Sequence, residues 1–412
     1  MMRPCTAILS FSGSLALLCP LALWLKERFF SSIPVMDGAT SWFWIAQPLL
    51  LTVFFFSSAT TVRHKILCYA CIIAASSFLA FSAAEVYFRL LNIKFVNRED
   101  RSHDSLYVKS GQTTHLFLKD GTCPDPVLGY GATPKKMRLA ECAVKGDKVL
   151  YDVLYSTDED GRRITPDSGD NADTAVLLFG CSFTFGLGIH DQETYAWQLG
   201  TRLGKRFQVF NYGFCGYGSH QMLALIESGR LDVLLRRYKR IYAFYLTIAD
   251  HEMRCVGHWM IDVVLPGPRY ILKNGALQYA GMLNENQERD KLFCGSQIIY
   301  RLMKEYHRHW APYSALDIHA AIIAKSMQEL TARYHAHALT VIWPDFTRIE
   351  PILRDHGVRI LSLTGVMPDF TAAPHGKYTI EDDGHPNAWA NTLIAEALSE
   401  YILKHPLVAG ER

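Results

Sequence analysis

The run TAVLLFGCS, from Thr174 to Ser182, decides the fold of this chain. Its first six residues are continuously apolar and end at Gly180, which is typical of a strand buried on both faces of a parallel sheet. Further strands are predicted at 207–210, 241–248, 339–343 and 358–363, and helices at 193–203, 219–238, 296–336 and 387–403. Strands that alternate with helices indicate βαβ units, so we expect a parallel sheet with helices on both faces.

Two segments flank or interrupt this α/β pattern. Residues 92–173 are polar and rich in turn residues, and Val149–Tyr155 alternates as a strand does, so we expect a small β-rich segment packed against the α/β domain. Residues 251–295 break the rhythm, and Asn274-Gly275 within them predicts a hairpin in an insertion. The α/β domain itself is expected to cover residues 174–412.

The first 91 residues are far more apolar than the rest of the chain. Three stretches, at about residues 5–25, 41–59 and 66–88, have the length that a helix needs to cross about 30 Å of hydrocarbon. A cleaved signal peptide is the alternative for the first stretch, but two further apolar stretches follow it. We therefore expect about three transmembrane helices at residues 1–91, and an integral protein of the inner (cytoplasmic) membrane.

Composition narrows the partners of the soluble part. The 412 residues include 42 basic and 40 acidic side chains, for a net charge of +2, and this near balance argues against nucleic-acid binding. Cys123 and Cys142 are the closest cysteine pair in the soluble part, so they are the candidates for a disulfide. No Cys/His spacing suggests zinc, and we expect neither a metal nor a cofactor. With the N-terminus in the cytoplasm, an odd number of spans would place the α/β domain in the periplasm or outside the cell, although the basic residues beside the spans do not favour that orientation.

Three loops carry residues suited to catalysis. In parallel sheets, functional residues lie at the carboxyl ends of strands. Ser182 lies in a glycine-flanked loop after the first strand, and a serine hydroxyl becomes a nucleophile once a base takes its proton. The loop Asn211–Ser219 has three glycines, whose backbone N–H groups can approach a developing oxyanion. In the loop before the last helix, Asp382 precedes His385 by three residues and could orient its imidazole.

These three blocks resemble those of the SGNH (GDSL-type) hydrolase family. Gly180–Thr184 resembles the family's first block, Asn211–Gly216 its second, and the stretch from Asp382 to Asn387 its last, over about residues 174–404. The resemblance implies a flavodoxin-like α/β/α sandwich and ester chemistry. It implies that Ser182 is the nucleophile, His385 the base and Asp382 the orienting acid, with Asp383 as a fallback. The N–H groups of Ser182 and Gly216 would line the oxyanion hole.

Two positions depart from the family pattern. Cys181 stands where the family usually has an aspartate before the serine. In the third block, Ala249 replaces the asparagine that donates to the oxyanion, and the loss of one such donor can cost about 10²–10³ in rate. Accessory residues that could compensate are clustered just after it, at Asp250, His251 and Arg254.

The sequence therefore predicts a membrane-anchored serine hydrolase that acts on esters, with O-acetyl groups on a glycan or cell-envelope polymer as the expected substrate. If a sugar hydroxyl replaces water, the same residues make an acetyltransferase. The alternative is a catalytically impaired module that binds glycans or scaffolds an envelope-polysaccharide assembly, which Ala249 would favour. Nucleotide binding at the glycine-rich loops is disfavoured, because neither GxGxxG nor a Walker motif is present.

Overall fold

A computed structural model describes residues 39–99, 122–132, 138–145, 148–257, 266–285, 296–374 and 376–407. The chain divides into two compact units. The smaller unit comprises residues 1–98, 260–263 and 287–305, and the larger unit comprises the remainder. The predicted span at 5–25 lies outside the described residues.

A five-stranded parallel sheet forms the centre of the larger unit, in the order β11-β10-β7-β5-β6. Its strands are β5 (Thr174–Phe179), β6 (Phe207–Asn211), β7 (Arg240–Thr247), β10 (His337–Ile342) and β11 (Ile360–Ser362). Numbered along the chain, this order is 2-1-3-4-5, the doubly wound order of flavodoxin-like folds. The prediction of a mixed α/β unit with a parallel sheet is confirmed. In this order the strand sequence reverses between β5 and β7, where ligands of such sheets bind.

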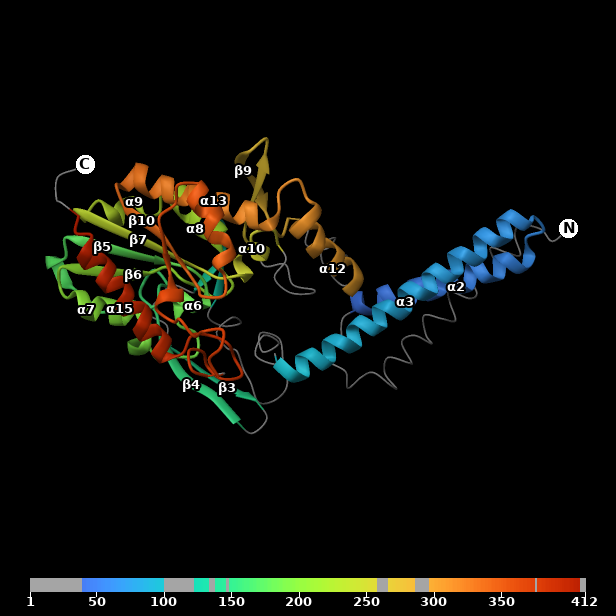
Figure 1. Ribbon diagram of the computed structural model, residues 1–412, viewed down its shortest axis with the longest axis horizontal. Helices are drawn as coiled ribbons and strands as arrows, with labels where there is room; N and C mark the ends of the chain where they lie inside the picture. The colour runs from blue at the N-terminus through green and yellow to red at the C-terminus, as the bar shows by residue number, and fades with distance from the viewer. Residues whose placement is uncertain are drawn as a thin grey trace. The chain divides into compact units, whose positions relative to one another are not determined.

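Each face of the sheet packs on its own hydrophobic core, because successive side chains of a strand point to opposite faces. Ala175, Leu177 and Phe179 join one core, while Val176 and Leu178 join the other. Helices α8, α9 and α13 cover the first face, and α7 and α15 cover the second (Figure 1). The helices and 3-10 turns are η4 (Asp191–Glu193), α7 (Tyr195–Leu203), α8 (Ser219–Glu227), α9 (Asp232–Leu235), α13 (Ala315–Tyr334), η6 (Thr347–Ile349), α14 (Glu350–Asp355), η7 (Leu363–Gly365) and α15 (Ala388–Lys404).

Two predicted helices are interrupted in the structure. The helix expected at 219–238 breaks after α8, where the chain turns through Gly229 before α9 begins. The helix expected at 296–336 divides into α12 (Gln297–Glu305), a π turn (Tyr306–Trp310) and α13. Ser314 caps α13, because its hydroxyl accepts the N–H of Asp317 at 3.1 Å. Capping chemistry thus overrides the continuous apolar periodicity that predicted one long helix.

The predicted β-rich segment contains two antiparallel hairpins. The first pairs β1 (Thr122–Asp125) with β2 (Gly129–Ala132), and the second pairs β3 (Arg138–Lys145) with β4 (Lys148–Ser156). A 3-10 turn, η3 (Gly169–Asn171), follows them. Cys123 is a free thiol that donates to the carbonyl of Ala132, so the predicted disulfide with Cys142 is wrong in this structure. Cys123 lies on β1 of the first hairpin, and Cys142 lies on β3 of the second.

The predicted insertion contains a short helix and the expected hairpin. Helix α10 (Asp250–Arg254) follows β7, and β8 (Pro268–Lys273) pairs with β9 (Ala276–Met282) across Asn274-Gly275. Both turn residues have positive φ, which is the conformation that this dipeptide favours. The insertion's residues 258–265 and 286–295 lie outside the described part.

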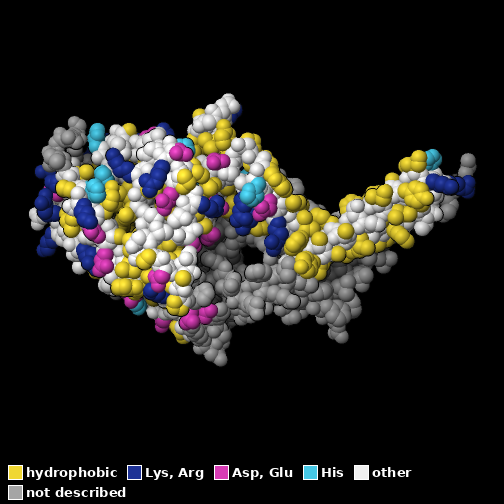
Figure 2. Space-filling view, in the orientation of Figure 1, with side chains coloured by type: hydrophobic (Ala, Val, Ile, Leu, Met, Phe, Trp, Pro, Cys, Tyr) yellow, Lys and Arg dark blue, Asp and Glu magenta, His cyan; other side chains and the backbone are white. Residues whose placement is uncertain are grey.

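The smaller unit is built on a hairpin of two apolar helices, α2 (Ala39–Thr61) and α3 (Lys65–Glu99). Three side chains bond across it to backbone carbonyls: Cys68 to Ala59, Thr52 to Ala75 and Ser82 to Ile45. The contacting positions recur every seven residues along each helix. Small residues at such spacing let two helices approach closely, as in membrane proteins. Figure 2 shows hydrophobic side chains covering this hairpin.

The prediction of three spans is supported for one of them. Within the described residues, Lys65–Phe88 is the helix that is long and apolar enough to cross a membrane, with 24 residues. The apolar part of α2, Ile45–Thr61, is shorter than the usual span. Helix α3 also continues to Glu99, beyond the predicted boundary at residue 91.

A buried carboxylate lies near the end of this apolar helix. Glu85 is fully buried and accepts hydrogen bonds from the N–H groups of Gln297 and Ile298 and from the hydroxyl of Ser296. These donors form the N-terminus of α12, where backbone N–H groups lack intrahelical acceptors and where negative charge is favourable. Glu85 therefore joins α3 to α12 within the smaller unit.

Candidate active site

The nucleophile loop follows β5 directly. Cys181 caps the four-residue helix α6 (Ser182–Phe185), so that Ser182 occupies its first position. The carbonyl of Cys181 accepts the N–H groups of Thr184 at 3.0 Å and Phe185 at 2.9 Å, which closes the turn. Ser182 is consequently held at the carboxyl end of a central strand, beside the switch point of the sheet.

The structure brings Ser182 and His385 together, although 203 residues separate them in sequence. The Oγ of Ser182 lies 2.8 Å from Nε2 of His385. On the other side of the ring, Nδ1 lies 2.5 Å from Oδ1 of Asp383. This arrangement fits a hydroxyl nucleophile, a general base and an orienting acid. All three side chains are largely withdrawn from solvent, which strengthens the hydrogen bonds between them.

The prediction of Asp382 as the orienting acid is wrong: the carboxylate on Nδ1 belongs to Asp383, the fallback. The chain makes a tight turn here, in which the N–H groups of Asp383 and Gly384 both donate to the carbonyl of Ile380. Asp382 takes the left-handed conformation of that turn, with φ of 69°. Oδ1 of Asp383 also accepts the backbone N–H of His385 at 3.0 Å, an Asx-turn that fixes the carboxylate beside the ring.

Aromatic rings enclose one side of the histidine. The ring of Phe183, next to the serine, lies 5.4 Å from the His385 ring and 5.1 Å from that of Trp343. Trp343 is itself buried and contacts Phe370 edge to face. Packing of this kind restricts the rotamers of the imidazole and lowers the local polarity around it.

The two predicted oxyanion donors are buried at adjacent loops. In the described part of the chain, neither the N–H of Ser182 nor that of Gly216 has an acceptor. Asn211 ties the two loops together, since its amide donates to the carbonyl of Thr184 at 2.8 Å and its oxygen accepts the N–H of Gly213 at 3.0 Å. A Cβ at Gly213 would lie 2.5 Å from that of Thr184, so only glycine permits this contact. The contacts of Asn211 and Gly213 thus hold the loop of Gly216 against the loop of Ser182.

Three of the predicted accessory residues lie on α10 and have different surroundings. Asp250 is exposed, whereas Arg254 is buried, and its Nη1 donates to the carbonyl of Tyr217 at 3.0 Å. His251 is also buried, and its Nδ1 lies 2.7 Å from the hydroxyl of Tyr245. Burial lowers the pKa of His251 well below its usual value, and the charge of Arg254 adds to this effect. His251 is thus a buried, neutral residue whose Nδ1 contacts Tyr245.

Two residues of the β-rich segment contact the nucleophile loop and were not predicted from the sequence. Arg163 is fully buried, donates to Asp191 at 2.5 Å and to the carbonyls of Phe185, Gly186 and Ile189, and so supports the nucleophile loop from behind. The hydroxyl of Tyr155 accepts the N–H of Gly188 at 2.9 Å. No motif marks these positions, because a charged residue after an acidic turn is usually solvated.

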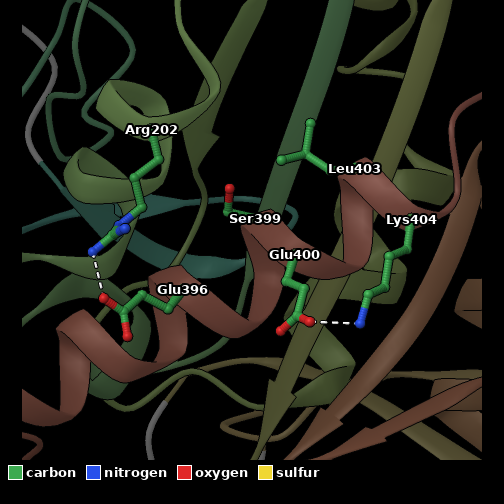
Figure 3. A pocket seen from close by; sticks show the side chains of 6 residues that line it. All are labelled: Arg202, Glu396, Ser399, Glu400, Leu403 and Lys404. Carbon is green, nitrogen blue, oxygen red and sulfur yellow. Dashed lines mark hydrogen bonds and ion pairs between the residues drawn. The ribbon is translucent and has the colours of Figure 1, made fainter.

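Other features of the surface do not compete with this site. Among the described residues, no group of three or more His, Cys, Asp or Glu side chains could hold a metal ion. A shallow hollow lies between α7 and α15 (Figure 3), where Arg202 pairs with Glu396 and Lys404 pairs with Glu400. Its charged groups already have partners, and none of the candidate catalytic residues lines it.

Comparisons with known proteins found similarity only among solved structures. No family model matches the chain, and no curated protein matches its sequence. A catalytic mutant of Axe2, an acetylxylan esterase from Geobacillus stearothermophilus, aligns at a TM-score of 0.33 and 13% identity, over 60% of this chain and 100% of that one. Est24, a carbohydrate acetylesterase from Sinorhizobium meliloti, aligns at a TM-score of 0.32 and 9% identity, over 56% of this chain and 99% of that one. TesA aligns at a TM-score of 0.32 and 13% identity, over 55% of this chain and 97% of that one. These scores are too low to carry a functional conclusion, which rests on the site itself.

Proposed function

We propose that this protein is a membrane-anchored serine ester hydrolase of the SGNH type, which acts on O-acetyl groups of a glycan or cell-envelope polymer. The observation that carries the proposal is the relay from Ser182 through His385 to Asp383. Among the described residues, the N–H groups of Ser182 and Gly216 have no acceptor, which supports a role as oxyanion donors. Nucleophile, base and orienting acid in hydrogen-bond reach are what acyl transfer requires.

In the proposed mechanism, the Oγ of Ser182 attacks the ester carbonyl carbon while Nε2 of His385 takes its proton. The carbonyl oxygen becomes an oxyanion, which the N–H groups of Ser182 and Gly216 stabilise. Collapse of the tetrahedral intermediate expels the alcohol, which receives the proton from His385, and leaves an acyl-enzyme. Water then attacks the acyl carbon by the same route, and an acceptor hydroxyl in its place would make the protein an acetyltransferase.

The membrane location is part of the proposal. Helix α3 has the length and apolarity to span a bilayer, and the α2–α3 hairpin exposes many large apolar side chains, such as Phe56, Ile66 and Ile73. Anchoring at the inner membrane, with the larger unit in the periplasm or outside the cell, would give the enzyme access to envelope polymers. Alkaline carbonate extraction of membranes tests the anchoring, and release of the full chain into the supernatant would contradict it.

The experiment that tests the catalytic role uses the full chain in detergent with p-nitrophenyl acetate and the variant Ser182→Ala. We expect the variant to lose the activity of the parent protein, because no other group replaces the nucleophile. Equal rates for the two proteins would contradict the proposal. That result would favour the second candidate, a module that binds glycans without hydrolysing them, which the absent side-chain donor at Ala249 supports.

A further inference from the structure

Two tyrosine hydroxyls connect the first β hairpin to the loop Tyr212–Gly218, termed here the oxyanion loop. Tyr130, on β2, donates its hydroxyl to the carbonyl of Cys215 at 2.8 Å. Tyr217 donates in return to the carbonyl of Tyr130 at 2.6 Å. Both side chains are buried, and their rings meet edge to face with centroids 5.4 Å apart. The hairpin and the oxyanion loop therefore support each other through reciprocal bonds.

The bond to Cys215 controls the direction of the Gly216 N–H. The carbonyl of Cys215 and the N–H of Gly216 belong to one peptide unit, which is planar and trans, so the two groups point in opposite directions. A donor that fixes the carbonyl fixes the N–H as well. Because Tyr130 holds the carbonyl on one side, the N–H of Gly216 points to the other side, away from the hairpin.

The Cys215–Gly216 peptide depends on an external hydrogen bond more than the Cys181–Ser182 peptide, the other predicted donor of the oxyanion hole, does. The Cys181–Ser182 peptide is fixed by α6, because the N–H groups of Thr184 and Phe185 bond the carbonyl of Cys181. Gly216 has no side chain and a φ of 77°, in a region open to glycine, and its neighbouring peptides can rotate at small cost. One donor of the hole is thus fixed by a helix and the other by a tyrosine from a distant part of the chain.

The Tyr130 hydroxyl is suited to hold a fixed position as a donor. Burial raises the pKa of Tyr130 well above its usual value, so the hydroxyl keeps its proton at neutral pH. The ring of Phe214 lies 6.0 Å from that of Tyr130 and confines it on a second side. A confined ring with a protonated hydroxyl presents its donor in one direction.

We propose that Tyr130 is a positioning residue of the oxyanion hole, which aims the N–H of Gly216 at the developing oxyanion through its hydrogen bond to Cys215. The inference rests on the proposed function, because it assigns a role within the same site. It gives the β-rich segment a part in catalysis. Ala249 supports the inference, because an oxyanion hole without a third, side-chain donor depends more on the direction of its two N–H groups.

The test is the variant Tyr130→Phe, measured in the full chain in detergent with p-nitrophenyl acetate. The substitution removes the hydroxyl and keeps the ring, so the fold is retained. We expect kcat to fall about ten-fold while KM stays within about two-fold, because the donor acts in the transition state more than in the ground state. Phenylboronic acid, which forms a tetrahedral adduct with an active serine, should bind the variant about ten-fold more weakly.

Tyr242→Phe is the matched control. Its hydroxyl also donates to a backbone carbonyl, that of His405, at 2.7 Å, but lies away from the candidate site. The Tyr242 hydroxyl also accepts the N–H of Leu407 at 3.1 Å, so Tyr242→Phe loses two hydrogen bonds and is the more demanding control for stability. Both variants should lower Tm by a few degrees, and only Tyr130→Phe should change kcat and boronate affinity.

An unchanged kcat in Tyr130→Phe, a loss confined to KM, or an equal loss of kcat in Tyr242→Phe would overturn the inference. Failure of the proposed function would be distinguishable from these results, because Ser182→Ala would then match the parent protein.

Discussion

At the scale of single residues, the position of the acid in the relay depends on one turn. Asp382 and Asp383 are adjacent and chemically identical, and spacing in the sequence favoured the first. The turn closed by Ile380 places Asp382 in the left-handed region and directs Asp383 to the imidazole. Backbone conformation, which composition does not reveal, therefore selects between two equivalent carboxylates.

This pair gives a sharp prediction. Asp383→Asn should lower kcat by up to about 10⁴, because the amide no longer stabilises the imidazolium or the required tautomer. Asp382→Asn is the matched control and should leave kcat within a few-fold of the parent protein. Both variants are measured with p-nitrophenyl acetate in the full chain. A larger loss in Asp382→Asn than in Asp383→Asn would contradict the geometry.

At the scale of elements, the nucleophile helix depends on a buried ion pair from outside the sheet. Arg163 lies at the end of the β-rich segment and bonds the carbonyls that end α6, while Asp191 neutralises its charge. The guanidinium also lies 4.6 Å from the centre of the Tyr155 ring and 4.9 Å from that of Phe185. The short helix α6 therefore takes its support from tertiary contacts, as helices of this length must.

Removal of the arginine should be costly for stability. Arg163→Met leaves the buried Asp191 without its counter-charge, and breaking such a pair costs about 3–5 kcal/mol of unfolding free energy. Arg206→Met is the control, because Arg206 is 70% exposed and pairs with Asp173 at 3.3 Å, so its loss should cost under about 1 kcal/mol. Urea unfolding in detergent measures both, and equal losses would contradict the assignment.

At the scale of the whole molecule, three histidines are buried in neutral form in the larger unit: His220, His251 and His319. His319, on α13, lies 2.8 Å from the hydroxyl of Ser219 with Nδ1 and 2.8 Å from that of Thr247 with Nε2. Burial lowers its pKa to about 3, and the repulsion that would arise if His319 and His220 were both protonated adds to the effect. These contacts join α8, β7 and α13, so protonation would act on the core of the larger unit.

The pH dependence of stability follows from this shift. The unfolded chain binds a proton at His319 below about pH 6.5, whereas the folded chain does so only near pH 3, so stability falls as pH falls through that window. His319→Gln should reduce the loss of unfolding free energy between pH 7 and pH 5 by about 2 kcal/mol. Unfolding at the two pH values measures the difference. His356 is exposed, so His356→Gln is the control and should leave the loss of unfolding free energy between the two pH values unchanged. A similar reduction in His356→Gln would contradict the assignment of the effect to His319.

Much of the architecture could be predicted from local sequence. The apolar run Thr174–Phe179 forms the buried strand β5, and Asn274-Gly275 forms a hairpin turn, because hydrophobic burial and turn conformation depend on a few adjacent residues. The long helix expected at 296–336 was not found as one element, since capping at Ser314 depends on a hydroxyl that periodicity ignores.

What the sequence by itself determined is the parallel α/β layout, the apolar N-terminal region, and the candidacy of Ser182 and His385, because these follow from periodicity and short motifs. Only the tertiary structure decided that Asp383 contacts His385 and that His251 is buried in neutral form. It also decided that Tyr130 and Arg163 bond backbone carbonyls of the two loops. The physical reason is that hydrogen-bond direction and burial arise from contacts between segments far apart in the chain, which no local pattern encodes.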